Sequence, residues 1–353
     1  MKITFFVGEF NGGGAERVIS ILANKLVERD FDIEILKYHN TENLYETNPR
    51  IVINSVEENT NTRKLLTNIV WLKKHFKENT DIIISFLAPF NIIALLANTG
   101  NNAPIIVADR NDPRRVPSNP IIRFIRNLLY RFADGIVLQT KDNKEYFSKA
   151  IQRKSVVISN PIDLKEKASI ALKTLKQNTI VTVARLEEQK NQKMLIRSFY
   201  ELKDEFNDYQ LVIYGEGSYR NELQSLIDEL EMSDRISLPG HKEDVIDRIA
   251  SSKLFVLCSN YEGMSNSLIE AMCLGLPVIC TKVSGTNELI VNNENGLLIN
   301  INNQKELTES IRKLLIDNEL SSKLATNASK LNDELNSDVI CDKWIEFINS
   351  IKK

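Results

Sequence analysis

The feature that most constrains the fold is an alternation of short apolar segments with longer segments whose apolar residues recur at helical spacing. In the first half of the chain, the short segments predict strands at residues 3–7, 33–36, 82–86, 105–108, 136–138 and 156–158. The longer segments between them predict helices at residues 15–28, 63–77, 120–132 and 141–150. Strands that alternate with helices in this way form a parallel, doubly wound sheet, so we predict an α/β fold.

The alternation stops at Asn160-Pro161, a pair typical of turns, and the polar, lysine-rich residues 164–178 follow. It then restarts, with strands expected at residues 179–183, 210–214, 236–238, 254–257, 277–280 and 297–299. The helices expected among them are residues 193–206, 218–231, 244–251, 266–273, 286–290 and 305–315. We therefore predict two Rossmann-like domains, residues 1–163 and 164–336, which face each other across a cleft. The last helical pattern, residues 337–353, is expected to pack back on the first domain.

The composition is that of a globular protein, with 42% hydrophobic and 26% charged residues. A formal net charge of −2 argues against a nucleic-acid-binding protein, which would carry a basic surface. The four cysteines, Cys258, Cys273, Cys280 and Cys341, lack the spacing of metal ligands. We expect them to be reduced, buried thiols of a cytoplasmic protein.

We expect no signal peptide, because the apolar run at residues 1–7 stops at Gly8-Glu9, and no apolar run of about 18 residues that could span a membrane occurs in the sequence. Residues 120–132 nevertheless combine a wide apolar surface with Arg123, Arg126 and Arg131. The helix either packs in the core with its arginines exposed, or it contacts anionic lipid or a lipid-linked pyrophosphate. We expect a cytoplasmic protein, and peripheral attachment to the inner face of the cell membrane stays open.

A loop that offers both backbone donors and carboxylates follows the strand at residues 254–257. It contains Glu262, and a helix with Glu270 begins near residues 265–267. The N-terminus of a helix suits phosphate oxygens, whereas carboxylates suit sugar hydroxyls, so the loop predicts a sugar-nucleotide pocket. Ser267 and Glu270 also fit a capping box, in which the glutamate would stabilise its own helix.

Two cations follow the strand at residues 179–183. Arg185 presents a fork that binds two oxygens and Lys190 adds a point charge, so together they can straddle a diphosphate. Gly240 follows the strand at residues 236–238 and would let the backbone pass close to a nucleoside. His39, His75 and His241 lack partners at metal-ligand spacing. We therefore expect Arg185 and Lys190, and no metal, to neutralise the phosphates.

In the first domain, Gly12, Gly13 and Gly14 lie between the first strand and its helix, where they would let the backbone approach a ligand. The loop is not a dinucleotide fingerprint, which would need a glycine at Arg17, and it lacks the Gly-Lys-Ser/Thr of a Walker loop. A tight turn with a purely structural role remains the alternative.

A charged cluster, Asp109-Arg110-Asn111-Asp112, follows the strand at residues 105–108. An arginine between two carboxylates at the carboxyl end of a strand could orient an acceptor or stabilise developing charge. The alternative is a loop whose charges pair with one another.

Together these motifs resemble the GT-B glycosyltransferases of family 4 along nearly the whole chain. The matching pieces are Gly13-Gly-Ala-Glu-Arg17, residues 181–190, Gly240, residues 261–266 and Gly275-Leu-Pro277-Val. Glu262 and Glu270 match the E-x7-E motif of that family. Residues 108–113 resemble the subset that extends lipid-linked oligosaccharides for bacterial glycans, although that subset often has Glu at the position of Asp109. Many relatives also carry a histidine in this loop, and this sequence does not.

The resemblance implies a retaining, metal-independent enzyme that needs no cofactor besides its UDP-sugar donor, a UDP-hexose or UDP-N-acetylhexosamine. Arg185 and Lys190 would bind the donor diphosphate, Glu262 the transferred sugar and Glu270 the ribose. The other donor-binding residues implied are Gly13, Gly14, Gly240, Gly263, Met264, Ser265 and Asn266. The catalytic candidates are Glu262, Arg185, Lys190, Arg110 and Asp109. The acceptor, a glycan that we expect to be linked to polyprenyl pyrophosphate, would meet Asn111, Asp112, Arg123 and Arg126.

Three other functions suit the same architecture. A sugar-nucleotide epimerase would change a UDP-sugar without any acceptor. A phosphorylase would need a lysine in a context that binds pyridoxal phosphate, and none is recognisable. A non-catalytic subunit of a polysaccharide assembly complex would bind nucleotide sugars without transferring them, but it would have no need for Glu262 and Glu270 together with both cations.

Overall fold

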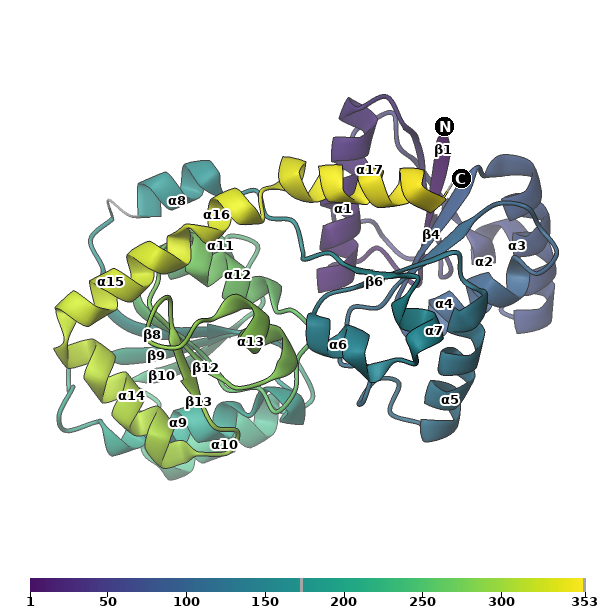
Figure 1. Ribbon diagram of the computed structural model, residues 1–353. Helices are drawn as coiled ribbons and strands as arrows, with labels where there is room; N and C mark the ends of the chain where they lie inside the picture. The colour runs from purple at the N-terminus through teal and green to yellow at the C-terminus, as the bar shows by residue number, and fades with distance from the viewer. Residues whose placement is uncertain (172–173, 352–353) are drawn as a thin grey trace. The chain divides into compact units, whose positions relative to one another are not determined.

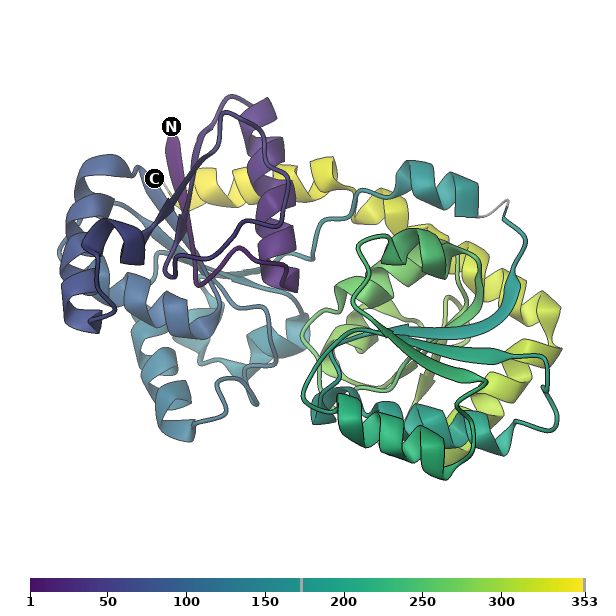
Figure 2. The ribbon, with the colours of Figure 1, turned by 180° about the vertical axis from the view of Figure 1, so that it is seen from behind.

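The computed structural model describes residues 1–171 and 174–351 and divides into two compact units (Figure 1). Unit 1 comprises Met1–Pro161 together with the described residues from Leu335 onward, and unit 2 comprises Ile162–Glu334. Each unit contains one parallel sheet flanked by helices (Figure 1, Figure 2). The predicted doubly wound α/β fold is confirmed.

The sheet of unit 1 has the strand order β3-β2-β1-β4-β5-β6-β7. Its strands are β1 (Lys2–Val7), β2 (Asp32–Lys37), β3 (Val52–Ser55), β4 (Ile82–Phe86), β5 (Ile105–Ala108), β6 (Gly135–Leu138) and β7 (Ser155–Val157). The sequence pattern did not predict β3. This strand pairs only with β2 at the edge of the sheet, so it needs little apolar character. The strand order reverses between β1 and β4, the place where doubly wound sheets bind ligands.

The helices of unit 1 are α1 (Gly14–Glu28), α2 (Val56–Thr60), α3 (Leu65–Asn79), α4 (Ala88–Ala97), α5 (Pro120–Leu129), the 3-10 helix η1 (Tyr130–Phe132), α6 (Lys141–Tyr146), α7 (Lys149–Gln152) and α17 (Ser337–Ile351). Helix α4 was not predicted, because it is apolar along most of its length and lacks an amphipathic period. It lies between α3 and α5. Helix α17 packs on α1, and its Trp344 ring stacks on Phe86 at 6.0 Å between ring centroids.

The sheet of unit 2 has the order β10-β9-β8-β11-β12-β13, which reverses between β8 and β11. Its strands are β8 (Gln177–Val183), β9 (Gln210–Tyr214), β10 (Ile236–Gly240), β11 (Ser252–Leu257), β12 (Val278–Thr281) and β13 (Leu297–Ile299). Its helices are α8 (Lys165–Ala171), η2 (Glu188–Lys190), α9 (Gln192–Glu201), α10 (Arg220–Glu229), α11 (Val245–Ala250), α12 (Asn266–Cys273), α13 (Ser284–Leu289), α14 (Gln304–Ile316), α15 (Asn318–Ser329) and α16 (Leu331–Glu334).

Part of the polar, lysine-rich segment 164–178 forms helix α8, which was not predicted, and residues 172–173 of the segment lie outside the described residues. Ala168 and Ala171 of α8 are buried, and Lys167 of the same helix pairs with Asp247 of unit 2 at 2.9 Å, so apolar and charged contacts both hold α8 on this unit. The central strands of both sheets are almost fully buried, because helices cover both faces. Within the described parts of the chain, the helices are all too short or too polar to cross a membrane.

Candidate functional site

The loop between β11 and α12 brings two of the predicted residues into direct contact. Glu262 is 7% exposed and accepts a hydrogen bond from Ser259 Oγ at 2.6 Å. The same carboxylate oxygen forms an ion pair with Lys190 Nζ. A cation proposed for phosphate and a carboxylate proposed for sugar hydroxyls thus share one place at the carboxyl end of the unit 2 sheet.

Backbone hydrogen bonds hold these two loops together. Asn260 N donates to Gln189 O at 2.7 Å, and Gln189 Nε2 donates to Tyr261 O, also at 2.7 Å. The main chain of the loop that carries Lys190 is therefore bonded to the main chain of the loop that carries Glu262. This contact holds the two side chains close together.

Arg185 lies at the surface of the same unit. Its side chain is 67% exposed and pairs with Glu187 at 2.9 Å. Its backbone is anchored, since Gln192 Nε2 donates to Arg185 O at 2.9 Å, and the next residue, Leu186, donates its N–H to Glu216 O at 2.9 Å. The guanidinium is therefore carried by a fixed loop while it remains accessible to a ligand.

Gly240 ends β10, and its carbonyl accepts a hydrogen bond from Gly215 N at 3.0 Å. It lies beside the loop that supports Leu186, since Gly215 is followed directly by Glu216. The structure therefore places Gly240 next to the arginine-bearing loop.

The start of α12 differs in one detail from the sequence interpretation. The N-cap is Ser265, whose Oγ accepts a hydrogen bond from Leu268 N at 3.4 Å. The alternative of a capping box between Ser267 and Glu270 is therefore wrong, because Glu270 lies beyond the first turn. Glu270 is buried inside α12, while Met264, also buried, precedes the cap.

A further contact at this loop was missed in the sequence. A Cβ placed on Gly285, in α13, would lie 1.5 Å from Gly263 O, so only glycine lets α13 approach the loop this closely. Thr281 Oγ1 also donates to Ser259 O at 2.5 Å. The signal available in the sequence was Ser284-Gly-Thr286, a cluster of small residues at a helix start directly after a strand.

Helix α1 covers the glycine loop of unit 1, Gly12–Gly14, from which it begins. The Glu16 carboxylate lies over Gly13, so that a Cβ on Gly13 would lie 1.9 Å from Glu16 Oε2. Burial raises the pKa of Glu16, while a hydrogen bond with its own backbone acts in the opposite direction. Glu16 holds the third position of α1, where glutamate commonly caps a helix. A phosphate could reach the N-terminal amides at Gly13 and Gly14 only if this carboxylate moved aside.

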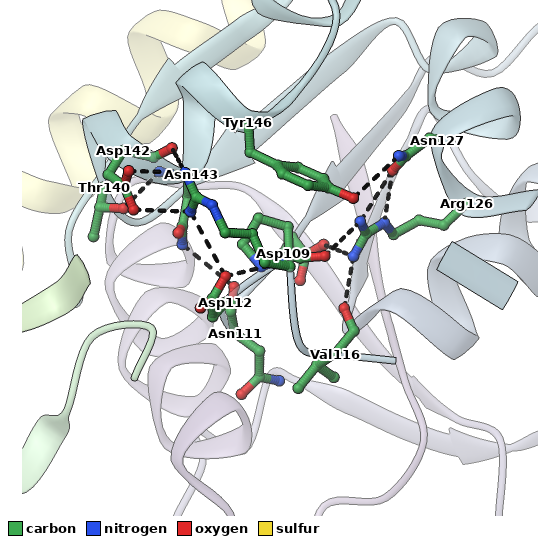
Figure 3. Close-up of polar contacts among 12 residues, drawn as sticks. Asp109, Asn111, Asp112, Val116, Arg126, Asn127, Thr140, Asp142, Asn143 and Tyr146 are labelled. Carbon is green, nitrogen blue, oxygen red and sulfur yellow. Dashed lines mark hydrogen bonds and ion pairs between the residues drawn. The ribbon is translucent and has the colours of Figure 1, made fainter. Parts of the chain in front are cut away.

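The loop after β5 contains a buried ion pair that fastens the loop to α5 (Figure 3). Asp109, 1% exposed, lies 3.6 Å from Arg126 Nη1 and accepts a hydrogen bond from Tyr130 OH at 3.3 Å. Burial raises the pKa of Asp109, and the positive charge of Arg126 opposes that shift. The fully buried Arg126 also donates to Pro113 O at 2.9 Å and to Val116 O at 2.6 Å.

These contacts correct two predictions. Asp109 was a catalytic candidate, but its carboxylate is enclosed by the core. Arg126 was expected on the acceptor or lipid side, but its guanidinium points inward, where backbone carbonyls and Asp109 use it. The contacts of both residues hold the loop after β5 against α5.

Arg110 points to another part of unit 1. Its Nη1 donates to Asn160 Oδ1 at 3.0 Å, and its guanidinium carbon lies 4.9 Å from the Phe86 ring centroid and 5.7 Å from that of Trp344. Burial lowers its pKa to about 9. Arg110 therefore links the loop after β5 to α17 and to the last residues of the first segment of unit 1.

Asn111 and Asp112 take part in contacts within the same loop region. Asn111 O accepts a hydrogen bond from Asn143 Nδ2 at 3.3 Å, and Asp112 Oδ1 accepts one from Arg114 N at 2.9 Å. For Asp112 the interpretation as a self-paired loop therefore holds (Figure 3).

Helix α5 exposes an apolar surface. Phe124 is 70% exposed, and the other exposed apolar residues of α5 and η1 are Ile121, Ile122, Ile125, Leu128 and Phe132. Arg123, at the start of the helix, donates to Pro117 O and Ser118 O at 2.8 and 2.7 Å. The alternative in which this helix packs in the core is therefore wrong for its outer face.

All four cysteines are buried and unbridged, and burial raises the pKa of each thiol. Within residues 1–171 and 174–351, no three His, Cys, Asp or Glu side chains are grouped so that they could hold a metal ion.

Two family models match the chain. The model for glycosyl transferases group 1 matches residues 164–331, and the model for Glycosyltransferase Family 4 matches residues 12–166. The two matches correspond broadly to the two units of the structure.

Two enzymes of Campylobacter jejuni are similar over most of their length. N-acetylgalactosamine-N,N'-diacetylbacillosaminyl-diphospho-undecaprenol 4-alpha-N-acetylgalactosaminyltransferase is 31% identical and covers 90% of this chain and 91% of its own. GalNAc-alpha-(1->4)-GalNAc-alpha-(1->3)-diNAcBac-PP-undecaprenol alpha-1,4-N-acetyl-D-galactosaminyltransferase is 27% identical and covers 100% of this chain and 99% of its own.

Among solved structures, Anabaena Alr3699/HepE in complex with UDP shares the fold with a TM-score of 0.80 at 19% identity, covering 99% of this chain and 100% of its own. Sucrose-phosphate synthase from Thermosynechococcus elongatus has a TM-score of 0.85 at 18% identity, covering 99% of this chain and 98% of its own. With these matches and the motifs of both units, the chain belongs to the GT-B glycosyltransferases of family 4 and is a glycosyltransferase.

Proposed function

We propose that the enzyme transfers a hexose or N-acetylhexosamine from a UDP-sugar to a polyprenyl-diphosphate-linked glycan in surface polysaccharide biosynthesis, with retention of the anomeric configuration. The observation that carries the proposal is the contact between Lys190 and Glu262 beside the N-terminus of α12. This arrangement supplies a cation for phosphate and a carboxylate for sugar hydroxyls within one fixed pair of loops.

The donor would bind to unit 2. Lys190 and the exposed Arg185 would bind the diphosphate, and Glu262 would turn from Lys190 to the hydroxyls of the transferred sugar. The backbone of Gly263 and the residues up to Asn266 would lie near that sugar, and Glu270 would bind the ribose. Solved structures that share the fold, such as Anabaena Alr3699/HepE, were obtained in complex with UDP, which supports a uridine nucleotide as the donor.

Transfer would proceed on one face of the donor sugar. The acceptor oxygen forms a bond to the anomeric carbon while the bond from that carbon to the β-phosphate oxygen breaks, and the leaving phosphate oxygen takes the acceptor's proton. Arg185 and Lys190 would stabilise the negative charge that grows on the diphosphate, an effect worth about 3 kcal/mol for one well-placed donor. With these cations in place, we expect no requirement for a metal.

Two lines of support concern the acceptor. Both Campylobacter relatives are named as transferases that act on glycans linked to undecaprenol through a diphosphate. The outer face of α5 is apolar, as a helix that lies at a membrane surface would be. We propose that α5 contacts the anionic inner face of the cell membrane, with Arg123 and Arg131 near the lipid head groups.

The function can be tested by incubating the purified enzyme with UDP-N-acetylgalactosamine, UDP-N-acetylglucosamine, UDP-galactose and UDP-glucose, each with a polyprenyl-diphosphate-linked saccharide. We expect a longer product with an α linkage from at least one donor, at an unchanged rate in EDTA. A β linkage would contradict retention, and loss of activity in EDTA would contradict metal independence.

A parallel reaction without acceptor separates the alternatives. A changed sugar on UDP would indicate an epimerase, and binding of UDP-sugars without transfer to any acceptor would indicate a binding subunit.

The membrane contact has its own test. Replacing Ile121 and Phe124 with serine should lower binding to phosphatidylglycerol vesicles by about tenfold or more, because each buried apolar side chain contributes about 1.5–3 kcal/mol. The matched control is Leu175→Ser, which removes an exposed apolar side chain from unit 2. Equal losses from both changes would show that α5 has no special part in the contact.

A further inference from the structure

The carboxyl end of the unit 1 sheet carries a histidine beside Gly8, the residue that follows β1. His39 follows β2, and its N–H donates to Gly8 O at 2.9 Å. Its ring stands edge-on to Phe90 at 6.2 Å between centroids, and the Phe90 ring occupies the space that a side chain on Gly8 would need. Gly8 follows β1 and Phe90 belongs to the helix after β4, so His39 lies near the point where the strand order reverses.

A carboxylate fixes the orientation of this ring. His39 Nδ1 lies 3.1 Å from Glu57 Oε1, and the other oxygen of Glu57 accepts a hydrogen bond from Asn40 N at 3.4 Å. Arg63 is the other charged group at Glu57, at 3.7 Å. Because a carboxylate can only accept a hydrogen bond, the neutral imidazole carries its proton on Nδ1 and presents a lone pair at Nε2.

The His39 ring is accessible to solvent. The His39 side chain is 40% exposed, and within residues 1–171 and 174–351 no hydrogen bond to Nε2 occurs. A neutral nitrogen that accepts a hydrogen bond suits a hydroxyl group and not a phosphate. The geometry points to His39 as an acceptor-binding residue, which holds a hydroxyl of the acceptor saccharide through Nε2 while Glu57 keeps the ring oriented. This role rests on the proposed transfer to a glycan.

The chain contains a matched histidine–carboxylate pair that lacks this exposure. His75 Nε2 lies 3.0 Å from Glu34 Oε2, and the His75 ring stacks on Trp71 at 4.7 Å. The His75 side chain is only 12% exposed. Its partner Glu34 lies within β2, whereas Glu57 lies beyond the carboxyl end of a strand. His75 therefore shares the local chemistry of His39 without access to a ligand.

The experiment compares His39→Ala, His39→Gln and Glu57→Gln with the control His75→Gln. The probes are UDP-N-acetylgalactosamine and a polyprenyl-diphosphate-linked saccharide that ends in N-acetylgalactosamine. We expect His39→Ala to raise the acceptor KM by about tenfold, the effect of one lost hydrogen bond, with the donor KM and the UDP dissociation constant unchanged. His39→Gln, which keeps an acceptor oxygen near the place of Nε2, should restore part of the loss. Glu57→Gln should fall between, and His75→Gln should leave the acceptor KM at the wild-type value.

If the wild type transfers sugar and His39→Ala has the same acceptor KM as the wild type, the assignment of His39 is overturned and the proposed function stands. Equal increases in the acceptor KM and the donor KM, or an acceptor KM raised as much by His75→Gln, would show a structural role instead. If the wild type transferred no sugar, the proposed function would fail. Calorimetric binding of the same saccharide would then decide the assignment, which requires weaker binding by His39→Ala than by the wild type.

Discussion

The loops that follow β11 in unit 2 and β5 in unit 1 use similar residues for different purposes. Each loop follows a central strand and contributes the carboxylate of an ion pair, Glu262 with Lys190 in unit 2 and Asp109 with Arg126 in unit 1. In unit 2 the exposed Arg185 lies on a neighbouring loop, and the glutamate has only Ser259 and Lys190 as hydrogen-bond partners among the described residues. In unit 1 the arginine is fully buried and also binds two backbone carbonyls.

The comparison shows that a position after a strand does not by itself identify a ligand-binding residue. A buried arginine with several backbone acceptors is committed to holding its loop, because removing it would leave those groups unpaired. An ion pair with few other partners can be exchanged for contacts with a ligand. Substitutions in unit 2 should therefore change activity most, and substitutions in the loop of unit 1 should change stability most.

The largest effect is expected at the unit 2 loop. Lys190→Ala, Arg185→Ala and Glu262→Gln should each lower kcat by about 100-fold or more, because each removes a charge that would act on the reacting diphosphate or sugar. Steady-state kinetics with the best donor measures this, and thermal unfolding shows whether the fold is kept. Turnover near the wild-type value for Arg185→Ala would remove that residue from the diphosphate site.

The next effect concerns stability in unit 1. Arg126→Met should lower the free energy of unfolding by about 3 kcal/mol or more, because it leaves Asp109 as a buried charge without its cation. Urea unfolding measures this change. Arg131→Met, on the same stretch of chain but exposed, is the control and should change stability by about 0.5 kcal/mol or less. Similar losses from both changes would contradict the structural role of Arg126.

A substitution at Gly285 tests the unit 2 loop without changing a charged residue. Gly285→Ala should displace the Gly263 carbonyl, lowering stability by about 1–3 kcal/mol and raising the donor KM. Kinetics with varied UDP-sugar at saturating acceptor measures the second effect. A loss of stability with an unchanged donor KM would show that the Gly263 backbone lies away from the donor.

The last effect appears only when the pH is varied, and it concerns a second buried carboxylate of unit 1, Glu34. Burial raises its pKa, but the hydrogen bonds from His75 and Asn54 and the charges of His75 and Lys2 together outweigh burial and lower the pKa to about 2. Because the pKa of Glu34 is lower in the folded state, the ionised carboxylate stabilises the fold at pH values above its ordinary pKa of 4.5. This contribution, on the order of 3 kcal/mol, is lost as the pH falls from 4.5 toward 2.

Urea unfolding of the wild type and Glu34→Gln between pH 6 and pH 3 measures this contribution. The variant should be less stable at pH 6, and the difference should shrink as the pH falls. A constant difference across this range would show that Glu34 does not titrate as the structure indicates.

Local patterns were enough to predict much of the fold. The apolar spacing predicted the bounds of strands β4, β5, β9 and β13 and helices α12 and α17. Each of these elements is long or apolar enough for its pattern to be recognised in the sequence. Strand β3 and helix α4 were missed, since one is a short edge strand and the other lacks an amphipathic period. Several motifs also lie at the carboxyl ends of strands, as the alternation required.

The roles of individual charged residues could not be predicted in the same way. Asp109 and Arg126 are 17 positions apart in the sequence, and nothing local shows that the turn before α5 brings them together in the core. The covering of Gly13 by Glu16 and the cap at Ser265 likewise depend on side-chain positions that composition does not reveal.

The sequence by itself thus determined the two α/β units, the family and the loops on which its motifs lie, because periodicity and motif spacing act between neighbours along the chain. Only the tertiary structure decided which charges pair at the loops beyond the unit 2 sheet and which are enclosed in the core of unit 1, because burial and hydrogen-bond partners come from segments distant in sequence. Glu262 and Lys190, 72 positions apart, meet in one pair of loops, whereas Arg126 turns inward to Asp109.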